Sequence, residues 1–222
     1  MAKLKQDLRY TIRPMQDDDL SQAIEVDREA FPTQWPHPTY TSFKQELRNR
    51  LAHYIVASQQ IDFMPPIEET SDNKTFWEKL KRLLNPEQYS NGSIPLSSKE
   101  RIIGIAGFWI MVGEAHITTI AVRNTCRRLG VGEQLLISLI DMSARLDAQV
   151  VTLEVRQSNE QAQVLYQKYG FYKVGVRHRY YTDNGEDAFI MTTDVISSPS
   201  FQSHFLGLKK AYEQKWGNFL NY

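Results

Sequence analysis

The chain contains a single cysteine, Cys126, among its 222 residues. One thiol excludes an intramolecular disulfide and a cysteine-rich zinc site, and it fits a reducing compartment. The five histidines show no metal-ligand spacing, so we expect no metal. No apolar run approaches the roughly 20 residues needed to cross a bilayer, and the first residues carry no apolar signal core. These absences predict a soluble, cytoplasmic protein.

Neither sign of charge dominates the chain. Lys plus Arg and Asp plus Glu number 26 each, so the formal net charge is zero. Nothing therefore favours bulk attraction to nucleic acid or to a membrane surface, and we expect neither as a partner. The length suits one well-buried domain with additions and is rather short for two.

Apolar spacing along the chain alternates between the periods of strands and of helices. We expect hairpin turns at Glu114–His116 and Thr182–Gly185. Together the segments predict one α/β domain with a mixed sheet. Strands are expected at 10–14, 53–57, 102–112, 117–122, 150–155, 171–181 and 188–195, and helices at 17–31, 40–51, 132–146 and 159–169.

Two segments look like additions to this domain. Residues 58–100 are polar and hold Pro65-Pro66, with helical apolar spacing only at 76–84, which indicates an insertion between two strands. After Ser197, Phe201, Phe205, Leu208, Tyr212 and Trp216 form a helical stripe that we expect to pack on the domain. The predicted organisation is a domain over 1–195, interrupted at about 58–100, and a helical extension over 196–222.

A glycine loop follows the apolar strand 117–122. Gly130 and Gly132 permit close backbone approach, and the helix that starts there offers unpaired N–H groups to a pyrophosphate. Arg127 and Arg128 add positive charge at the rim. A tight strand-to-helix turn with solvated arginines explains the same residues. No Walker lysine follows, and a Rossmann fingerprint fits poorly.

A carboxylate and a phenol follow about twenty residues later. Glu154 ends the strand 150–155, where partial desolvation should raise its pKa toward that of a general base. The alternative is an ion pair with Arg156 or another cation. Tyr166 can give a proton to a leaving group, or it is an ordinary half-buried aromatic. Asn159 is placed to cap the helix that carries Tyr166.

The motif Arg127-x-x-Gly130-x-Gly132 resembles the coenzyme A loop of the GNAT superfamily of N-acetyltransferases, over about residues 10–195 without the insertion. Leu153-Glu154-Val155-Arg156-x-Ser158-Asn159 and Tyr180-Tyr181-x-Asp183 are similar to the ribosomal-protein-alanine N-acetyltransferases (RimI-like). The resemblance implies a mostly antiparallel sheet, flanked by helices, that splays after Val122. The opening is a slot in which the pantetheine arm of acetyl-CoA pairs with strand backbone.

The resemblance also implies residue roles. Glu154 is the general base, directly or through water, and Tyr166 is the general acid. Glu133 stands where a cation is common, so Arg127 and Arg128 must supply part of the positive charge for the phosphates. The implied cofactor-binding residues are Ile120, Ala121, Val122, Arg127, Arg128, Leu129, Gly130, Val131, Gly132, Glu133 and Asn159.

The implied acceptor is a protein N-terminal α-amine, and more narrowly the N-terminal alanine of the eighteenth small-subunit ribosomal protein. Transfer is expected to be direct, in a ternary complex. Trp35, Tyr180 and Tyr181 are candidates for the walls of a peptide groove, although ordinary packing explains them too. Acetylation of lysine or of a small-molecule amine is an alternative, as is a coenzyme A-binding protein without catalysis.

Overall fold

The computed structural model of the chain describes residues 9–33, 36–60 and 100–217. Two compact units are present, residues 1–59 with 102–222 and residues 60–101. The first unit contains the sheet and helices treated below. Most of the segment predicted as an insertion, with the helix expected at 76–84, lies outside the described residues, and so does Trp35.

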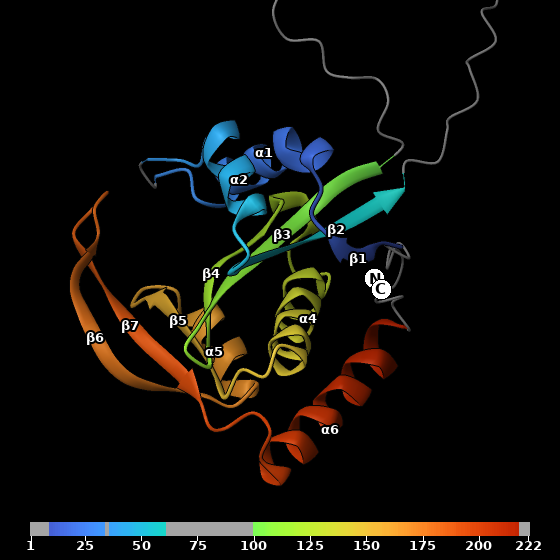
Figure 1. Ribbon diagram of the computed structural model, residues 1–222, viewed down its shortest axis with the longest axis vertical. Helices are drawn as coiled ribbons and strands as arrows, with labels where there is room; N and C mark the ends of the chain where they lie inside the picture. Colours follow the sequence, from blue (N-terminus) through green and yellow to red (C-terminus); the bar gives the residue numbers. More distant parts are fainter. Residues whose placement is uncertain (1–8, 34–35, 61–99, 218–222) are drawn as a thin grey trace, which may run out of the picture. The chain divides into compact units, whose positions relative to one another are not determined.

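The first unit is built on a seven-stranded sheet in the order β1-β2-β3-β4-β5-β7-β6 (Figure 1). β4 and β5 pair in parallel, whereas the pairs β1–β2, β3–β4, β5–β7 and β6–β7 are antiparallel. The predicted mixed, mostly antiparallel sheet is therefore confirmed. The strands are β1 (Thr11–Pro14), β2 (Ala52–Gln60), β3 (Glu100–Met111), β4 (Glu114–Val122), β5 (Val150–Arg156), β6 (Phe171–Tyr181) and β7 (Glu186–Thr193).

Helices cover both faces of the sheet, as Figure 1 shows, and each face has its own apolar core. Alternation along β2 feeds both cores, because Ile55 and Ala57 pack on the α4 side and Val56 on the α1 side. The helices predicted within the described residues are present with shifted ends. They are η1 (Asp17–Asp19), α1 (Leu20–Ala30), α2 (Tyr40–Arg48), η3 (Asn124–Cys126), α4 (Val131–Arg145), α5 (Glu160–Lys168) and α6 (Pro199–Trp216).

The turn between β3 and β4 differs from the prediction. We expected it at Glu114–His116, but these residues begin β4 and the turn is formed by Val112 and Gly113. Both have positive φ, 50° and 80°, as a two-residue hairpin turn requires. Gly113 adopts a positive φ without strain. The turn therefore forms at Gly113, although the polar residues that follow it suggested a turn one position later.

The pairing of β4 determines where the site forms. Gly107 pairs with Thr119 and Phe108 with Ile117, so Thr118 is an extra residue that bulges β4. The parallel pairing of β4 with β5 ends at Ile117 and Leu153. The splay that we expected after Val122 therefore begins earlier, directly after Ile117. The rest of β4 lines an opening instead of continuing the ladder.

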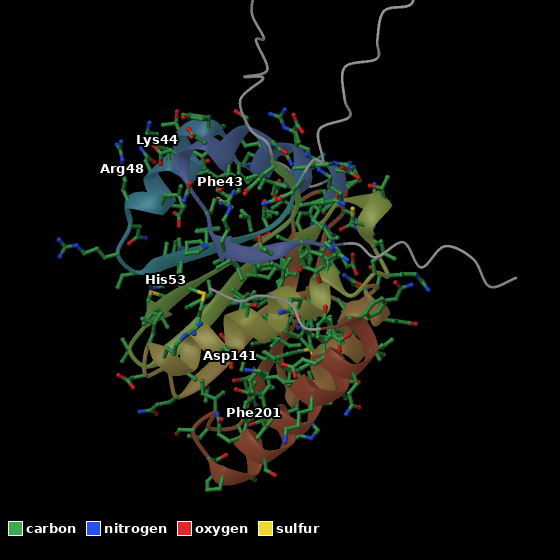
Figure 2. The ribbon with its side chains drawn as sticks, turned by 90° about the vertical axis from the view of Figure 1, so that its right-hand side faces the viewer. Phe43, Lys44, Arg48, His53, Asp141 and Phe201 are labelled. Carbon is green, nitrogen blue, oxygen red and sulfur yellow. The ribbon has the colours of Figure 1, made fainter. Side chains whose placement is uncertain are left out.

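The helix α6 packs on the domain, as its apolar stripe predicted. Phe201, Phe205 and Tyr212 are buried in the core on the α4 side. Figure 2 shows the side chains of Phe201 on α6 and Asp141 on α4. Lys209 of α6 forms an ion pair of 2.6 Å with Asp141. The C-terminal helix is thus an integral part of this core.

Gly107→Ala should destabilise the protein. A Cβ there would lie 2.3 Å from the ring of Tyr54, which is confined by edge-to-face contact with Phe43. Overpacking of this kind costs about 1–3 kcal/mol, so we expect a lower melting temperature. The control is Gly207→Ala, at an exposed site in α6 with no atom within 4 Å, which should stabilise by about 0.5–1 kcal/mol. Equal shifts in both variants would contradict this account of Gly107.

Candidate active site

A cavity of about 810 Å³ lies where β4 and β5 diverge. Its walls come from the segment after α1, from β4 and β5, from α5 and from the end of β6. The structure brings most of the predicted site residues to this cavity. Those that line it are Ile120, Ala121, Val122, Arg127, Gly132, Glu154, Asn159, Tyr166, Tyr180 and Tyr181.

The other predicted loop residues surround the start of α4. Gly130 is the N-cap of α4 with φ of 82°, and the helix begins at Val131. At Gly132 a Cβ would find only Val122 at 3.6 Å, so the backbone there is open toward the cavity. Helix N-termini of this form present N–H groups and positive potential to an anion. The local geometry therefore fits a phosphate group.

The charged residues of this loop divide between two tasks. Arg127 lies at the cavity rim, where its guanidinium donates to the carbonyl groups of Val122 and Ala30 at 3.4 Å. The carboxylate of Glu133 instead accepts from Lys168 at 2.6 Å and from the hydroxyl of Tyr169 at 2.7 Å. The acidic departure from the family pattern is thus neutralised by α5 and its end.

Glu154 is held by two cations. Its side chain is only 6% exposed, and its carboxylate lies 2.9 Å from Nε2 of His116 and 2.7 Å from Nε of Arg177. Burial raises the pKa of this carboxyl, but the hydrogen bonds and charges of His116 and Arg177 outweigh burial, and the pKa is lowered. The predicted rise was therefore wrong. It considered desolvation without these partners.

Arg156 is not the partner of Glu154. Its guanidinium pairs with Asp183 at 2.9 Å and with Glu186 at 3.1 Å, and it covers the ring of Tyr181 at 3.8 Å from the centroid. Asp183 also accepts from the hydroxyl of Thr33 at 2.6 Å. Arg156 thus fixes the β6–β7 turn, and this turn meets the loop that follows α1.

His116 was not identified as a site residue from the sequence, although its hydrogen bond helps to lower the pKa of Glu154. It pairs with Thr152 across the parallel ladder, so Glu154 lies two residues further along the same face. Nδ1 of His116 is 3.1 Å from the Thr152 hydroxyl. This hydroxyl donates its own hydrogen bond to Glu114 at 2.6 Å, so it faces His116 as an acceptor. Each ring nitrogen therefore faces an acceptor, which favours imidazolium. The hydrogen bond to Glu154 accordingly raises the pKa of His116.

Tyr166 reaches the cavity from α5. Asn159 caps this helix, because its side-chain oxygen accepts the N–H of Ala162 at 3.2 Å, as predicted. The ring of Tyr166 packs on Phe171 with centroids 5.8 Å apart. Burial raises the pKa of the phenol to about 12, so it is protonated at neutral pH. One cavity is thus lined by Glu154, whose lowered pKa favours the ionised carboxylate, and by His116 and Tyr166, whose raised pKa values favour their protonated forms.

The family model described as Acetyltransferase (GNAT) family matches residues 59–171. This chain belongs to the GNAT family. It is 32% identical, over 82% of its length and 94% of the relative, to a Bacillus subtilis (strain 168) protein with the provisional name [ribosomal protein bS18]-alanine N-acetyltransferase. An N-alpha-acetyltransferase of Sulfurisphaera tokodaii is 33% identical over 86% of this chain and 96% of the relative.

Solved structures share the fold. The ribosomal-protein-S18-alanine N-acetyltransferase from Escherichia coli superposes with a TM-score of 0.59 at 24% identity, covering 84% of this chain and 94% of that one. An N-acetyltransferase from Thermoplasma acidophilum in complex with coenzyme A has a TM-score of 0.54 at 16% identity, with 83% and 98% covered. The chain is a GNAT-type N-acetyltransferase, a family that uses acetyl-CoA.

Metal sites and membrane-spanning helices were both considered for residues 9–33, 36–60 and 100–217. Within them, no group of three or more His, Cys, Asp or Glu side chains is arranged to hold a metal ion. None of the helices in the same part of the chain is long and apolar enough to cross a membrane. Cys126 is buried in the core on the α4 side of the sheet.

The effect of Glu154 on the pKa of His116 is directly measurable. We expect NMR titration to give His116 a pKa above the reference of about 6.5, because Glu154 stabilises the imidazolium. Glu154→Gln should lower this pKa, and Arg177→Gln should raise it further by removing a repelling charge. Shifts of the same sign in both variants would contradict the network.

The same pair should make stability depend on pH. A histidine pKa that is raised in the folded state stabilises the protein fully below the unfolded value of about 6.5. This contribution is lost as the pH rises through the raised folded value. Denaturant titrations between pH 5 and 9 should therefore show a loss of stability across that interval in wild type, and a smaller one in Glu154→Gln.

Proposed function

We propose that this protein acetylates the N-terminal α-amine of another protein, with acetyl-CoA as donor and an N-terminal alanine of a small-subunit ribosomal protein as the preferred acceptor. The observation that carries the proposal is the convergence of the Glu154–His116 pair and Tyr166 on one cavity. The names of the Bacillus subtilis and Escherichia coli proteins support the ribosomal acceptor.

The residues of the slot fit acetyl-CoA. The donor supplies the thioester whose C–S bond breaks as the new amide bond forms. β4 leaves Ile120, Ala121 and Val122 beyond the last residue paired with β5, so their backbone groups can pair with the pantetheine arm. An N–H group there polarises the acetyl carbonyl. The backbone of residues 129–133 holds the pyrophosphate with Arg127 and Arg128, and Asn159 retains its amide N–H groups for the cofactor.

The Glu154–His116 pair acts as the base. A protein α-amine has a reference pKa of about 7.7–8.0 and must be neutral to attack. The pair accepts one proton when His116 is neutral, directly or through water. Because the pKa of His116 is raised, the base is matched to the amine better than an isolated carboxylate with a lowered pKa.

Tyr166 acts as the acid. Its raised pKa keeps the phenol protonated, so it has a proton to give to the thiolate that leaves when the C–S bond breaks. One proton thus moves from the amine to the His116–Glu154 pair and another from Tyr166 to sulfur. Transfer is direct, without an acyl-enzyme, since the only cysteine is buried.

The acceptor approaches along the aromatic end of β6. Tyr180 is 46% exposed and lines the cavity with Tyr181, whose ring is fixed by Arg156. Thr33, from the loop after α1, bonds to Asp183 of the β6–β7 turn. We assign these two segments to the walls of a groove for an extended peptide.

The acceptor class is tested by steady-state assays with acetyl-CoA and matched peptides. We expect thiol release with a peptide that begins with Ala, less with those that begin with Ser or Met, and none with an Nα-blocked peptide whose only amine is lysine. Release with the blocked peptide alone would sink the α-amine assignment. No thiol release with any peptide, together with release in the presence of a polyamine, would show that the acceptor is a small molecule.

Glu154→Gln should reduce kcat by about 100-fold or more, the range of a lost general base, with the Kd for coenzyme A nearly unchanged. In wild type kcat/KM should rise with pH through the raised pKa of the His116–Glu154 pair, and the variant should lose this limb. The matched control is Glu160→Gln, an exposed carboxylate at the start of α5. An equal loss in both variants would exclude Glu154 as the base.

A further inference from the structure

The C-terminal helix α6 reaches the loop that we assign to the pyrophosphate. The hydroxyl of Tyr212 donates to the carbonyl of Gly130 at 3.1 Å. One turn later, the indole of Trp216 covers the same residue, because a Cβ built on Gly130 would lie 2.9 Å from two of its ring carbons. Two side chains of α6 thus hold a single residue, the N-cap of α4.

The carbonyl oxygen of Gly130 accepts two hydrogen bonds. It accepts the N–H of Gln134 at 2.9 Å, as expected for an N-cap, and the second bond comes from Tyr212. Burial raises the pKa of Tyr212, so the phenol remains a donor throughout the physiological range. The orientation of this carbonyl is therefore set from outside α4 as well as from within it.

This orientation also determines a donor of the cradle. In a trans peptide the C=O of Gly130 and the N–H of Val131 point in opposite directions. Fixing the carbonyl on Tyr212 therefore fixes the N–H of Val131, the first of the donors that α4 leaves unpaired. Gly130 has φ of 82° and the wide conformational freedom of glycine, so this peptide plane gains most from an external restraint.

The same helix is anchored to the end of α5. His204 lies 3.0 Å from the carbonyl of Lys168, and Phe205 contacts the ring of Tyr169. Tyr169 in turn donates to Glu133 in the first turn of α4. Figure 1 shows α6 running beside α4. α6 is thus fixed at both ends of its length, which makes it a rigid support.

We propose that Tyr212 and Trp216 are positioning residues for the pyrophosphate of coenzyme A. They act through Gly130 by aiming the first N–H donors of α4. This inference rests on the proposed role of the 129–133 loop, and it gives a task to the C-terminal helix, which the resemblance to the family left without one.

The test compares two donors that differ in the phosphate-bearing part. Tyr212→Phe should weaken the binding of coenzyme A, measured by calorimetric titration, by about 3- to 10-fold, the range of one lost hydrogen bond. Trp216→Leu, which removes the packing on Gly130, should also raise the Kd for coenzyme A. The kcat/KM with acetyl-CoA should fall by the same factor. The kcat/KM with S-acetyl-pantetheine, which lacks the pyrophosphate and the adenosine, should not change.

Phe201→Leu is the control for general loosening of α6, because Phe201 is buried in the first turn of the same helix, at the opposite end from Tyr212 and Trp216. It should lower the melting temperature and leave the Kd for coenzyme A unchanged. The proposal is overturned if both test variants behave like this control, or if the two donors lose equally. Wild type that binds coenzyme A but acetylates nothing refutes only the proposed function, whereas wild type that does not bind it refutes both.

Discussion

The ladder between β4 and β5 stops at Ile117 and Leu153, and the rest of the site depends on this interruption. The bulge at Thr118 bends β4 just beyond the last pair, so its following backbone groups face an opening. Buried backbone donors and acceptors need partners, and here the partner has to come from outside the chain. His116 and Glu154 flank the last pair, which places the proton-accepting groups at the inner end of that opening.

The local parts of the structure could be predicted from the sequence. Gly130 and Gly132 mark a strand-to-helix junction through their own backbone freedom, and Asn159 marks a helix start through its side chain. Glu154 and Tyr166 both reached the cavity, because each follows from its position in one strand or helix. These signals span a few residues, and tertiary context did not alter them.

The parts that failed depend on contacts between distant segments. The prediction of a turn at Glu114–His116 assigned His116 to a loop. His116 is in fact part of β4, where it faces Glu154. The pKa of Glu154 was predicted from burial alone, because Arg177 arrives from β6 through the order of strands in the sheet. Strand register and ion-pair partners are properties of the assembled sheet, so one segment of sequence cannot specify them.

The hydroxyls of Tyr10 and Tyr212 lie 3.1 Å apart although 202 positions separate them in the chain. Closing so long a loop is entropically costly and gains nothing until both ends have found the core. Synthesis delivers Tyr212 after every strand of the sheet, although a domain generally folds as a unit. The nascent chain therefore contains the glycine loop before the helix that supports it has been added, so an incomplete chain lacks both side chains that hold Gly130.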